Sequence, residues 1–323
     1  MPRGDALWYA GQDRVELRTE QACAPGAGDV CVAARFSGIS RGTERLIFSG
    51  RVPASEYQRM RCPHQAGDFP FPVKYGYALV GEVEQGPASL MGKSVFLLHP
   101  HQRKMCVPAG NVHVIPEGVP LKRAALAANI ETALNVTWDS GAAPGDKVLV
   151  VGGGVLGLLT AAIIAGIPGT TVTVADVDPT RAPIAAKLGA AFTLPDAAPR
   201  DQDIVIHTSS TAAGLQVALA SAGTEARVVE ASWYGDKDVA VPLGEAFHAR
   251  RLQLISSQVG AVPPARRARW TTARRMASAL SLLRDSRFDA LITGEIAFDD
   301  AVTEVPKVLS GGSAGLMTVL RYT

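Results

Sequence analysis

The segment from Gly152 to Gly157 limits the possible folds more than any other part of the chain. Apolar, β-branched residues of a predicted strand, Lys147–Val151, precede it, and a predicted helix, Val155–Ala165, follows it. The segment fits the pattern G-x-G-x-x-G in the strand–turn–helix setting that this motif requires. We therefore expect a doubly wound α/β domain whose helix N-terminus binds a diphosphate. The expected contacts there are Gly152, Gly154, Val155, Leu156 and Gly157.

An acidic residue ends the second predicted strand of this unit. Asp176 lies nineteen residues after Gly157, where a carboxylate can accept hydrogen bonds from both ribose hydroxyls of a dinucleotide. The same charge repels a 2′-phosphate, so NAD is favoured over NADP. Arg181, five residues further on, could soften that preference.

Further cofactor contacts are expected at the carboxyl ends of the parallel strands, where ligands bind in such sheets. Each of these hydroxyl residues could equally be an ordinary strand-end residue. The candidates are Thr208, Ser209, Ser232 and Ser257. Two alternatives remain for the glycine segment: a turn that binds no nucleotide, and a methyltransferase that binds S-adenosylmethionine.

The order of predicted elements indicates two kinds of domain. The first 115 residues or so contain short strands punctuated by Gly, Pro and Asp, as in a compact barrel. Strands and helices then alternate, which implies a parallel sheet. The last thirty residues are again strand-like. We expect a β-rich domain over 1–118, a dinucleotide-binding domain over 119–265 and a return to the first domain over 266–323.

Composition excludes several other classes of protein. The net charge of +2 argues against binding to nucleic acid or to a membrane through bulk charge. The four cysteines, Cys23, Cys31, Cys62 and Cys106, form no CxxC pair, so we expect free thiols rather than a zinc lobe or a disulfide framework. The N-terminal residues do not resemble a signal peptide, and the cytoplasm is the expected location.

The whole pattern resembles the medium-chain dehydrogenase/reductase superfamily. Ser37–Pro53 (SGISRGTERLIFSGRVP) is similar to the zinc-less branch that includes bacteriochlorophyllide dehydrogenase. This resemblance covers nearly the whole chain. It implies a GroES-like barrel with a Rossmann domain, an active site in the cleft between them, a nicotinamide cofactor, an alcohol or carbonyl substrate and a homodimer. It also implies that Thr132 contacts the cofactor.

The resemblance allows the catalytic zinc ligands of the superfamily to be compared with this chain. Ser40 stands where zinc enzymes carry a Cys, and Tyr77 and Ala78 stand where they carry His and Glu. If Thr132 is the cofactor contact, the remaining Cys position is Ala128. These residues cannot form a zinc site of the usual type, so we expect no zinc. The spacing at Arg41–Thr43 is one residue longer than usual, which puts the role of Thr43 in doubt.

Without zinc, the oxygen of the substrate needs a protein hydrogen-bond donor. Tyr77 is the first candidate, with Thr43 as a proton relay, Glu44 orienting it, and Glu131 on a helix expected to face the nicotinamide. The simpler interpretations are that Tyr77 only packs in the barrel, that Thr43 and Glu44 cap a loop, and that Glu131 is a charge on a helix surface.

Two further groups of residues are expected to be structural. His99 and His101 are predicted on a loop surface, and His64 is the histidine most suited to titrate. A basic run is predicted to be a solvated helix face, with an anion-binding patch as the alternative; it contains Arg266, Arg267, Arg269, Arg274 and Arg275.

The sequence therefore predicts an NAD(P)-dependent, zinc-independent oxidoreductase of small alcohols or carbonyls. The alternatives are a quinone or enone reductase of the same fold and a dinucleotide-binding sensor without catalysis.

Overall fold

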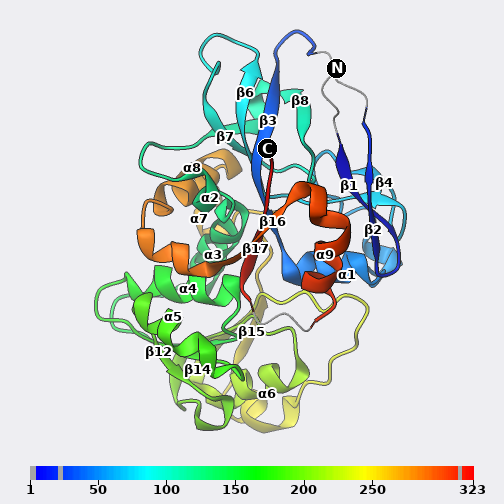
Figure 1. The fold of residues 1–323 in the computed structure, drawn as a ribbon. Coiled ribbons are helices and arrows are strands. Elements are labelled where there is room, and N and C mark those ends of the chain that lie inside the picture. The colour runs from blue at the N-terminus through cyan, green and yellow to red at the C-terminus, as the bar shows by residue number, and fades with distance from the viewer. Residues whose placement is uncertain (1–4, 21–24, 312–314) are drawn as a thin grey trace. The chain divides into compact units, whose positions relative to one another are not determined.

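The computed structural model describes residues 5–20, 25–311 and 315–323. The chain forms two compact units, one of residues 1–128 and 292–323 and the other of residues 129–291 (Figure 1). These limits differ from the predicted borders after residues 118 and 265. Residues 266–291 in particular lie in the second unit. The predicted borders stay predictions, and each unit is described by itself.

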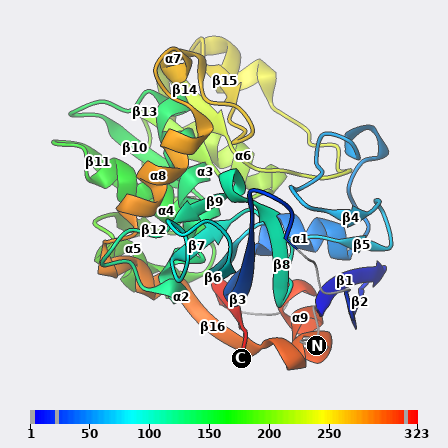
Figure 2. The same cartoon turned by 90° about the horizontal axis from the view of Figure 1, so that it is seen from above.

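The second unit is built on a six-stranded parallel sheet in the order β12-β11-β10-β13-β14-β15 (Figures 1 and 2). Its strands are β10 (Lys147–Val151), β11 (Thr171–Ala175), β12 (Ala191–Thr193), β13 (Gln202–His207), β14 (Ala222–Glu230) and β15 (Gln253–Ser256). This topology confirms the predicted doubly wound sheet. The Val and Ile side chains of β10 and β13 are buried, as the interior strands of such a sheet require.

Helices connect the parallel strands, because a parallel crossover needs a segment that returns the chain. Helices α4 (Val155–Ala165), α5 (Ala182–Lys187) and α6 (Ala212–Ser221) lie between successive strands, whereas α3 (Ala127–Ser140) precedes β10, and α7 (Pro264–Arg267) and α8 (Thr272–Leu282) follow β15. Helix α4 packs on β11 and α6 packs on β13. The bounds of α4 are those predicted from the sequence, whereas the helix predicted over 121–139 is divided into α2 (Leu121–Ala124) and α3.

The first unit contains two sheets whose strands pair antiparallel, except for the last two strands of the chain, which pair in parallel. One sheet has the order β2-β1-β5-β4 and the other the order β16-β17-β3-β6-β7-β9, with β8 paired to β3. The strands are β1 (Ala6–Gly11), β2 (Arg14–Arg18), β3 (Asp29–Ile39), β4 (Ala66–Gly67), β5 (Val73–Lys74), β6 (Leu79–Gln85), β7 (Ser94–Leu97), β8 (Lys104–Pro108), β9 (Val112–Val114), β16 (Ile292–Ala297) and β17 (Met317–Arg321). Strand β17 pairs with β3, so the C-terminal segment completes this sheet.

Two helices of the first unit pack beside these sheets. Helix α1 (Arg41–Phe48) follows β3 after one residue, and α9 (Ala301–Leu309) packs against α1 and β2 (Figure 2). The connection between β3 and α1 is short, and Ser40 within it and Glu44 in the first turn of α1 are buried.

The cysteines correct one expectation from the sequence. Cys31 on β3 and Cys106 on β8 form a disulfide, although free thiols were predicted. The two residues are direct partners in the antiparallel ladder, so the pairing depends on strand register, which cysteine spacing does not reveal. Cys62 is a buried free thiol, and Cys23 lies outside the described residues.

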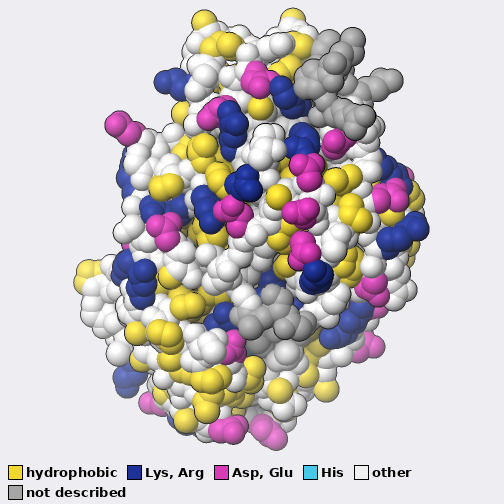
Figure 3. All heavy atoms as spheres, viewed as in Figure 1, with side chains coloured by type: hydrophobic (Ala, Val, Ile, Leu, Met, Phe, Trp, Pro, Cys, Tyr) yellow, Lys and Arg dark blue, Asp and Glu magenta, His cyan; other side chains and the backbone are white. Residues whose placement is uncertain are grey.

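The surface carries charges of both signs. On the face drawn in Figure 3, basic and acidic side chains are interspersed, in keeping with the near balance of charge in the sequence. Among the helices of the described ranges, none combines the length and the hydrophobicity that a membrane-spanning segment needs.

Candidate functional site

The segment Gly152–Gly157, called the glycine turn below, leaves open space on one side and is tightly packed on the other. A Cβ atom on Gly157 would lie 1.9 Å from the carbonyl oxygen of Gly152, so α4 can approach β10 this closely only with glycine there. A Cβ atom on Gly154 would meet nothing within 4 Å. The first N–H groups of α4, at Val155 and Leu156, follow this open position. The turn therefore fits the close approach of a diphosphate.

Asp176 lies directly after β11 and against the glycine turn. Its carboxylate accepts hydrogen bonds from the backbone N–H of Gly153, at 2.5 Å, and of Asp178, at 2.8 Å. Arg181 packs close by, since its Cγ would lie 3.3 Å from a Cβ on Gly153, and it forms an ion pair with Asp178. The predicted neighbourhood of Asp176, Arg181 and the glycine turn is thus present in one unit.

The hydroxyl residues predicted to contact the cofactor lie at three places. The Thr208 hydroxyl donates to the carbonyl oxygen of Gly152 at 2.9 Å, so the end of β13 touches the glycine turn. Ser209 and Ser232 belong to a cluster around the buried His207. Ser257 donates to the Asp139 carboxylate at 2.6 Å. Thr132 is half-buried on α3.

In the first unit, Tyr77 lies among the hydroxyls that follow β3. Its hydroxyl hydrogen-bonds to Ser40 Oγ and lies 3.2 Å from Thr43 Oγ1. Burial raises the pKa of Tyr77 to about 12, against the opposing effect of the Ser40 and Thr43 hydrogen bonds. Tyr77 is therefore a neutral hydrogen-bond donor at physiological pH. Sequence reasoning identified Tyr77 and Thr43 but gave Ser40 no role beyond its lost metal ligand.

Glu44 supports this group through the backbone rather than through the hydroxyls. The side chain is fully buried, and one carboxylate oxygen accepts the backbone N–H of Ser40 at 2.7 Å. The other accepts the Tyr9 hydroxyl at 2.5 Å and lies 2.9 Å from His101 Nε2. Glu44 thus fixes the backbone at Ser40, and these bonds occupy both of its oxygens with groups other than Thr43, the residue that it was predicted to orient.

The histidines correct a second expectation. His99 and His101 were predicted on the surface, but both are buried. His101 Nδ1 lies 2.7 Å from Ser37 Oγ, which in turn lies 2.8 Å from the Tyr322 hydroxyl on the C-terminal segment. Burial lowers the pKa of His99 to about 3, and burial also lowers the pKa of His64, which stacks on His99. Nothing in the local sequence signals this network, because its members meet only through the sheet.

Glu131 forms a buried ion pair. Its carboxylate lies 3.0 Å from Arg275 Nε, and the Arg275 guanidinium also donates to Asn135 and to the carbonyl oxygens of Val259 and Ala261. Burial raises the pKa of Glu131, and Arg275 opposes this rise. Arg275 is therefore not part of a solvated basic face, whereas Arg266, Arg267, Arg269 and Arg274 are exposed.

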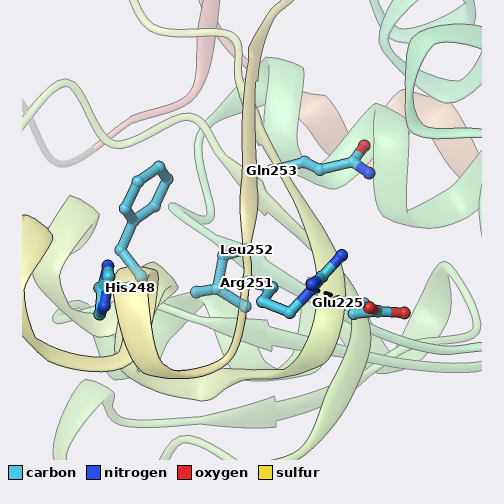
Figure 4. A pocket seen from close by; sticks show the side chains of 6 residues that line it. Glu225, His248, Arg251, Leu252 and Gln253 are labelled. Carbon is cyan, nitrogen blue, oxygen red and sulfur yellow. Dashed lines mark ion pairs between the residues drawn. The ribbon is translucent and has the colours of Figure 1, made fainter.

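Two further features delimit the site. Within the described ranges, no group of three or more His, Cys, Asp or Glu residues is placed to hold a metal ion. A hollow of about 550 Å³ lies near the amino ends of β14 and β15 (Figure 4). The glycine turn lies at the other end of the parallel strands, after the carboxyl end of β10. The charged residues of the hollow, Glu225 and Arg251, pair with each other, so this hollow does not favour an anionic ligand such as a dinucleotide.

Comparison with known proteins agrees with this geometry. No protein-family model matches the chain. The chain is 25% identical over 263 residues to 2-dehydro-3-deoxy-L-galactonate 5-dehydrogenase of Pseudoalteromonas atlantica, covering 69% of this chain and 74% of that protein.

Solved structures share the fold over the full length. L-idonate 5-dehydrogenase of Escherichia coli K-12 superposes with a TM-score of 0.81 at 15% identity, covering 99% of this chain and 98% of the other. A short chain alcohol dehydrogenase of E. coli CFT073, complexed with NADH, gives 0.79 at 18% identity with 99% of both chains covered. With its parallel sheet, glycine turn and N-terminal unit of largely antiparallel sheets, the chain shares the fold of these dehydrogenases.

Proposed function

We propose that the protein is an NAD-preferring, zinc-independent dehydrogenase that interconverts an alcohol and a carbonyl compound. The observation that carries this proposal is the Asp176 carboxylate beside the glycine turn, with open space at Gly154. Two relatives named as 5-dehydrogenases, of L-idonate and of 2-dehydro-3-deoxy-L-galactonate, support an alcohol or carbonyl substrate.

The preference for NAD rests on the charge and hydrogen bonding of Asp176. Two backbone N–H groups hold the carboxylate in place, and its remaining lone pairs can accept ribose hydroxyls. A 2′-phosphate would bring a second negative charge to this carboxylate. The Arg181 guanidinium, which could offset that charge, is already paired with Asp178.

When bound, the nicotinamide ring supplies the hydride acceptor or donor, and the protein manages the proton of the substrate oxygen. Tyr77 is the proposed hydrogen-bond donor to that oxygen, since its hydroxyl stays protonated; its single proton, which it donates to Ser40 Oγ in the structure, would turn to the substrate oxygen. Glu44 contributes by fixing the backbone at Ser40. Glu131 is left out of this set, because its carboxylate is paired with Arg275.

The proposal of chemistry without zinc rests on the donor atoms at the corresponding positions. Ser40 and Tyr77 offer hydroxyls and Ala78 offers no donor atom, a set that does not suit the N and S preference of Zn²⁺. The Ser40 and Tyr77 hydroxyls are moreover bonded to each other. The closer likeness to the bacteriochlorophyllide dehydrogenase branch stays a prediction.

We also propose a homodimer. Among the described residues, β15 forms an edge of the six-stranded sheet, and Leu254 on this strand is 36% exposed. An exposed edge strand with an apolar side chain is a surface on which a second copy can extend the sheet. Sedimentation velocity should give the mass of a dimer; a monomer at micromolar concentration would contradict this part.

The cofactor proposal is tested by titrating the purified protein with NAD, NADH, NADP and NADPH in a calorimeter, with metal analysis of the same sample. We expect tighter binding of NAD and NADH, less than stoichiometric zinc, and NAD reduction with secondary alcohols. Turnover only with enones or quinones would indicate a reductase. Tight binding without turnover would indicate a sensor, and stoichiometric zinc needed for activity would overturn the zinc-independent chemistry.

A further inference from the structure

A buried histidine in the second unit bridges an acid and a serine at the carboxyl end of β13. The His207 side chain is fully buried. Its Nδ1 lies 2.8 Å from Glu230 Oε2 at the end of β14, and its Nε2 lies 2.7 Å from Ser209 Oγ. Neither His207 nor Glu230 has a role in the function proposed above. Residues of this kind, buried, polar and joined in a chain, hold a defined geometry only when every member is satisfied.

The acid determines which way the histidine presents its proton. Glu230 also accepts the backbone N–H of Ser232 at 2.8 Å and the Tyr234 hydroxyl at 3.0 Å. Burial raises the pKa of Glu230, but the hydrogen bond and charge of His207 with the Ser232 contacts outweigh it, and the net shift is downward. A carboxylate oxygen 2.8 Å from Nδ1 favours the tautomer that carries its proton on Nδ1, in which Nε2 accepts the Ser209 O–H.

The series of hydrogen bonds continues from Ser209 to the N-terminus of α6. Ser209 Oγ lies 2.9 Å from Thr211 Oγ1, and Thr211 Oγ1 accepts the backbone N–H of Gly214 at 3.0 Å. A Cβ on Gly214 would lie 2.1 Å from Ser209 Oγ and 2.7 Å from His207 Nε2, so glycine is required beneath this contact.

These bonds leave Ser209 Oγ with one lone pair that can still accept a hydrogen bond. Its proton goes to His207, one lone pair accepts from Thr211, and one lone pair remains. If His207 were protonated, the donors and acceptors in this series of hydrogen bonds would exchange roles. Ser209 would then accept from Nε2–H and donate to Thr211. In either case the half-buried Ser209 can only accept a further hydrogen bond, so it suits a ligand hydroxyl and not a phosphate oxygen.

The segment that carries Ser209 is tied to the glycine turn. Thr208 donates to the carbonyl oxygen of Gly152, and Ser210 has a φ of 55°, a left-handed conformation unusual for serine. The Ser210 N–H donates to Ser232 Oγ at 3.1 Å, which holds this conformation against β14. The cluster thus sets the position of Ser209 relative to the turn.

We propose that Ser209 accepts a hydrogen bond from a ribose hydroxyl of the bound dinucleotide, and that His207 with Glu230 acts as a positioning pair that keeps it an acceptor. This inference rests on the proposed function, since it assumes that the dinucleotide binds at the glycine turn. It adds a second hydroxyl-recognition point besides Asp176, at the end of β13, which is separated from β11 by β10.

The test uses a set of NAD analogues that each lack one ribose hydroxyl. Ser209→Ala should weaken NAD binding about 3- to 10-fold, the effect of one hydrogen bond. The wild type should bind the analogue that lacks the recognised hydroxyl more weakly than it binds NAD. Ser209→Ala should bind that analogue and NAD with equal affinity, so that this loss of affinity vanishes. His207→Leu should reduce that loss although Ser209 is present, because the Ser209 hydroxyl is then no longer held in place, whereas His207→Gln, which retains an acceptor, should restore part of it. Ser281→Ala, at an exposed serine of α8, is the matched control and should change nothing.

The outcomes separate this inference from the proposed function. Wild-type affinity of Ser209→Ala for NAD and for every analogue overturns the inference, provided that Asp176→Asn weakens binding. If Asp176→Asn also binds NAD as the wild type does, the proposed cofactor site itself is wrong. Should His207→Leu fail to fold, the analogue series with Ser209→Ala alone decides, because the hydroxyl of Ser209 can be removed without enlarging any side chain.

Discussion

Two glycines of the same turn provide a matched pair of substitutions with opposite expected effects. Gly157→Ala would place a methyl group 1.9 Å from the Gly152 carbonyl oxygen and 2.7 Å from Thr208 Oγ1. The first contact is with backbone, so α4 and the turn would have to separate by about 1 Å, a distortion that costs about 1–3 kcal/mol or more. Gly154→Ala meets no atom within 4 Å, and Gly154 has φ of −74° and ψ of −179°, which alanine adopts freely.

The expected stabilities follow from these contacts. Gly157→Ala should lower the Tm of a unit of this size by about 3–10 °C. Gly154→Ala should melt within about 1 °C of the wild type, because no contact or backbone strain is introduced. Differential scanning calorimetry without added nucleotide measures both values.

The expected affinities separate the two variants further. The methyl group of Gly154→Ala fills the space through which a diphosphate must reach the N–H groups of α4, so NAD affinity should fall about tenfold or more. Isothermal titration of a fully folded Gly154→Ala variant gives this number directly. NAD affinity equal to that of the wild type would refute our assignment of the diphosphate to this turn, and a large loss of Tm would refute the local geometry.

Three other predictions concern charge and protonation. Asp176→Asn should weaken NAD binding about tenfold and leave NADP binding unchanged or tighter, as measured by titration with both dinucleotides. Tyr77→Phe should lower kcat about 10- to 100-fold with unchanged affinity for NAD, and since the pKa of Tyr77 is about 12, the wild-type kcat should show no tyrosine ionisation between about pH 7 and 10. His99 binds its proton with a pKa of about 3 in the folded protein and about 6.5 when unfolded, so the free energy of unfolding should fall by up to about 1.4 kcal/mol per pH unit as the pH drops through this range. Urea titrations at several pH values should show that the free energy of unfolding of His99→Gln falls less steeply with decreasing pH than that of the wild type. Equal slopes for the two proteins would exclude His99 as the source of the decline.

The geometry around the glycine turn could be predicted from the sequence because it is local. The glycine turn, the strand before it and the helix after it are contiguous, and their spacing alone gave α4 its correct bounds. Asp176 could be found because a parallel sheet brings the end of one strand next to the start of the neighbouring helix. The parallel order of the sheet followed from alternating elements in the same way.

The polar network of the first unit could not be predicted, because its members are distant in sequence. Glu44 meets Tyr9 and His101 across separations of 35 and 57 residues, and Ser37 meets Tyr322 across 285. Each of these residues taken alone has an ordinary helix, loop or strand setting. The Cys31–Cys106 disulfide was missed for the same reason, since it depends on the register of β3 against β8.

The Arg275 guanidinium makes the segment after β15 dependent on a helix that follows it in the sequence. It reaches from α8 to two carbonyl oxygens, of Val259 and Ala261, and to Glu131 on α3. Part of the hydrogen bonding of the segment after β15 therefore comes from a helix later in the sequence. Truncating the protein before residue 275 should leave this connection open to proteases while the central strands already resist hydrogen exchange.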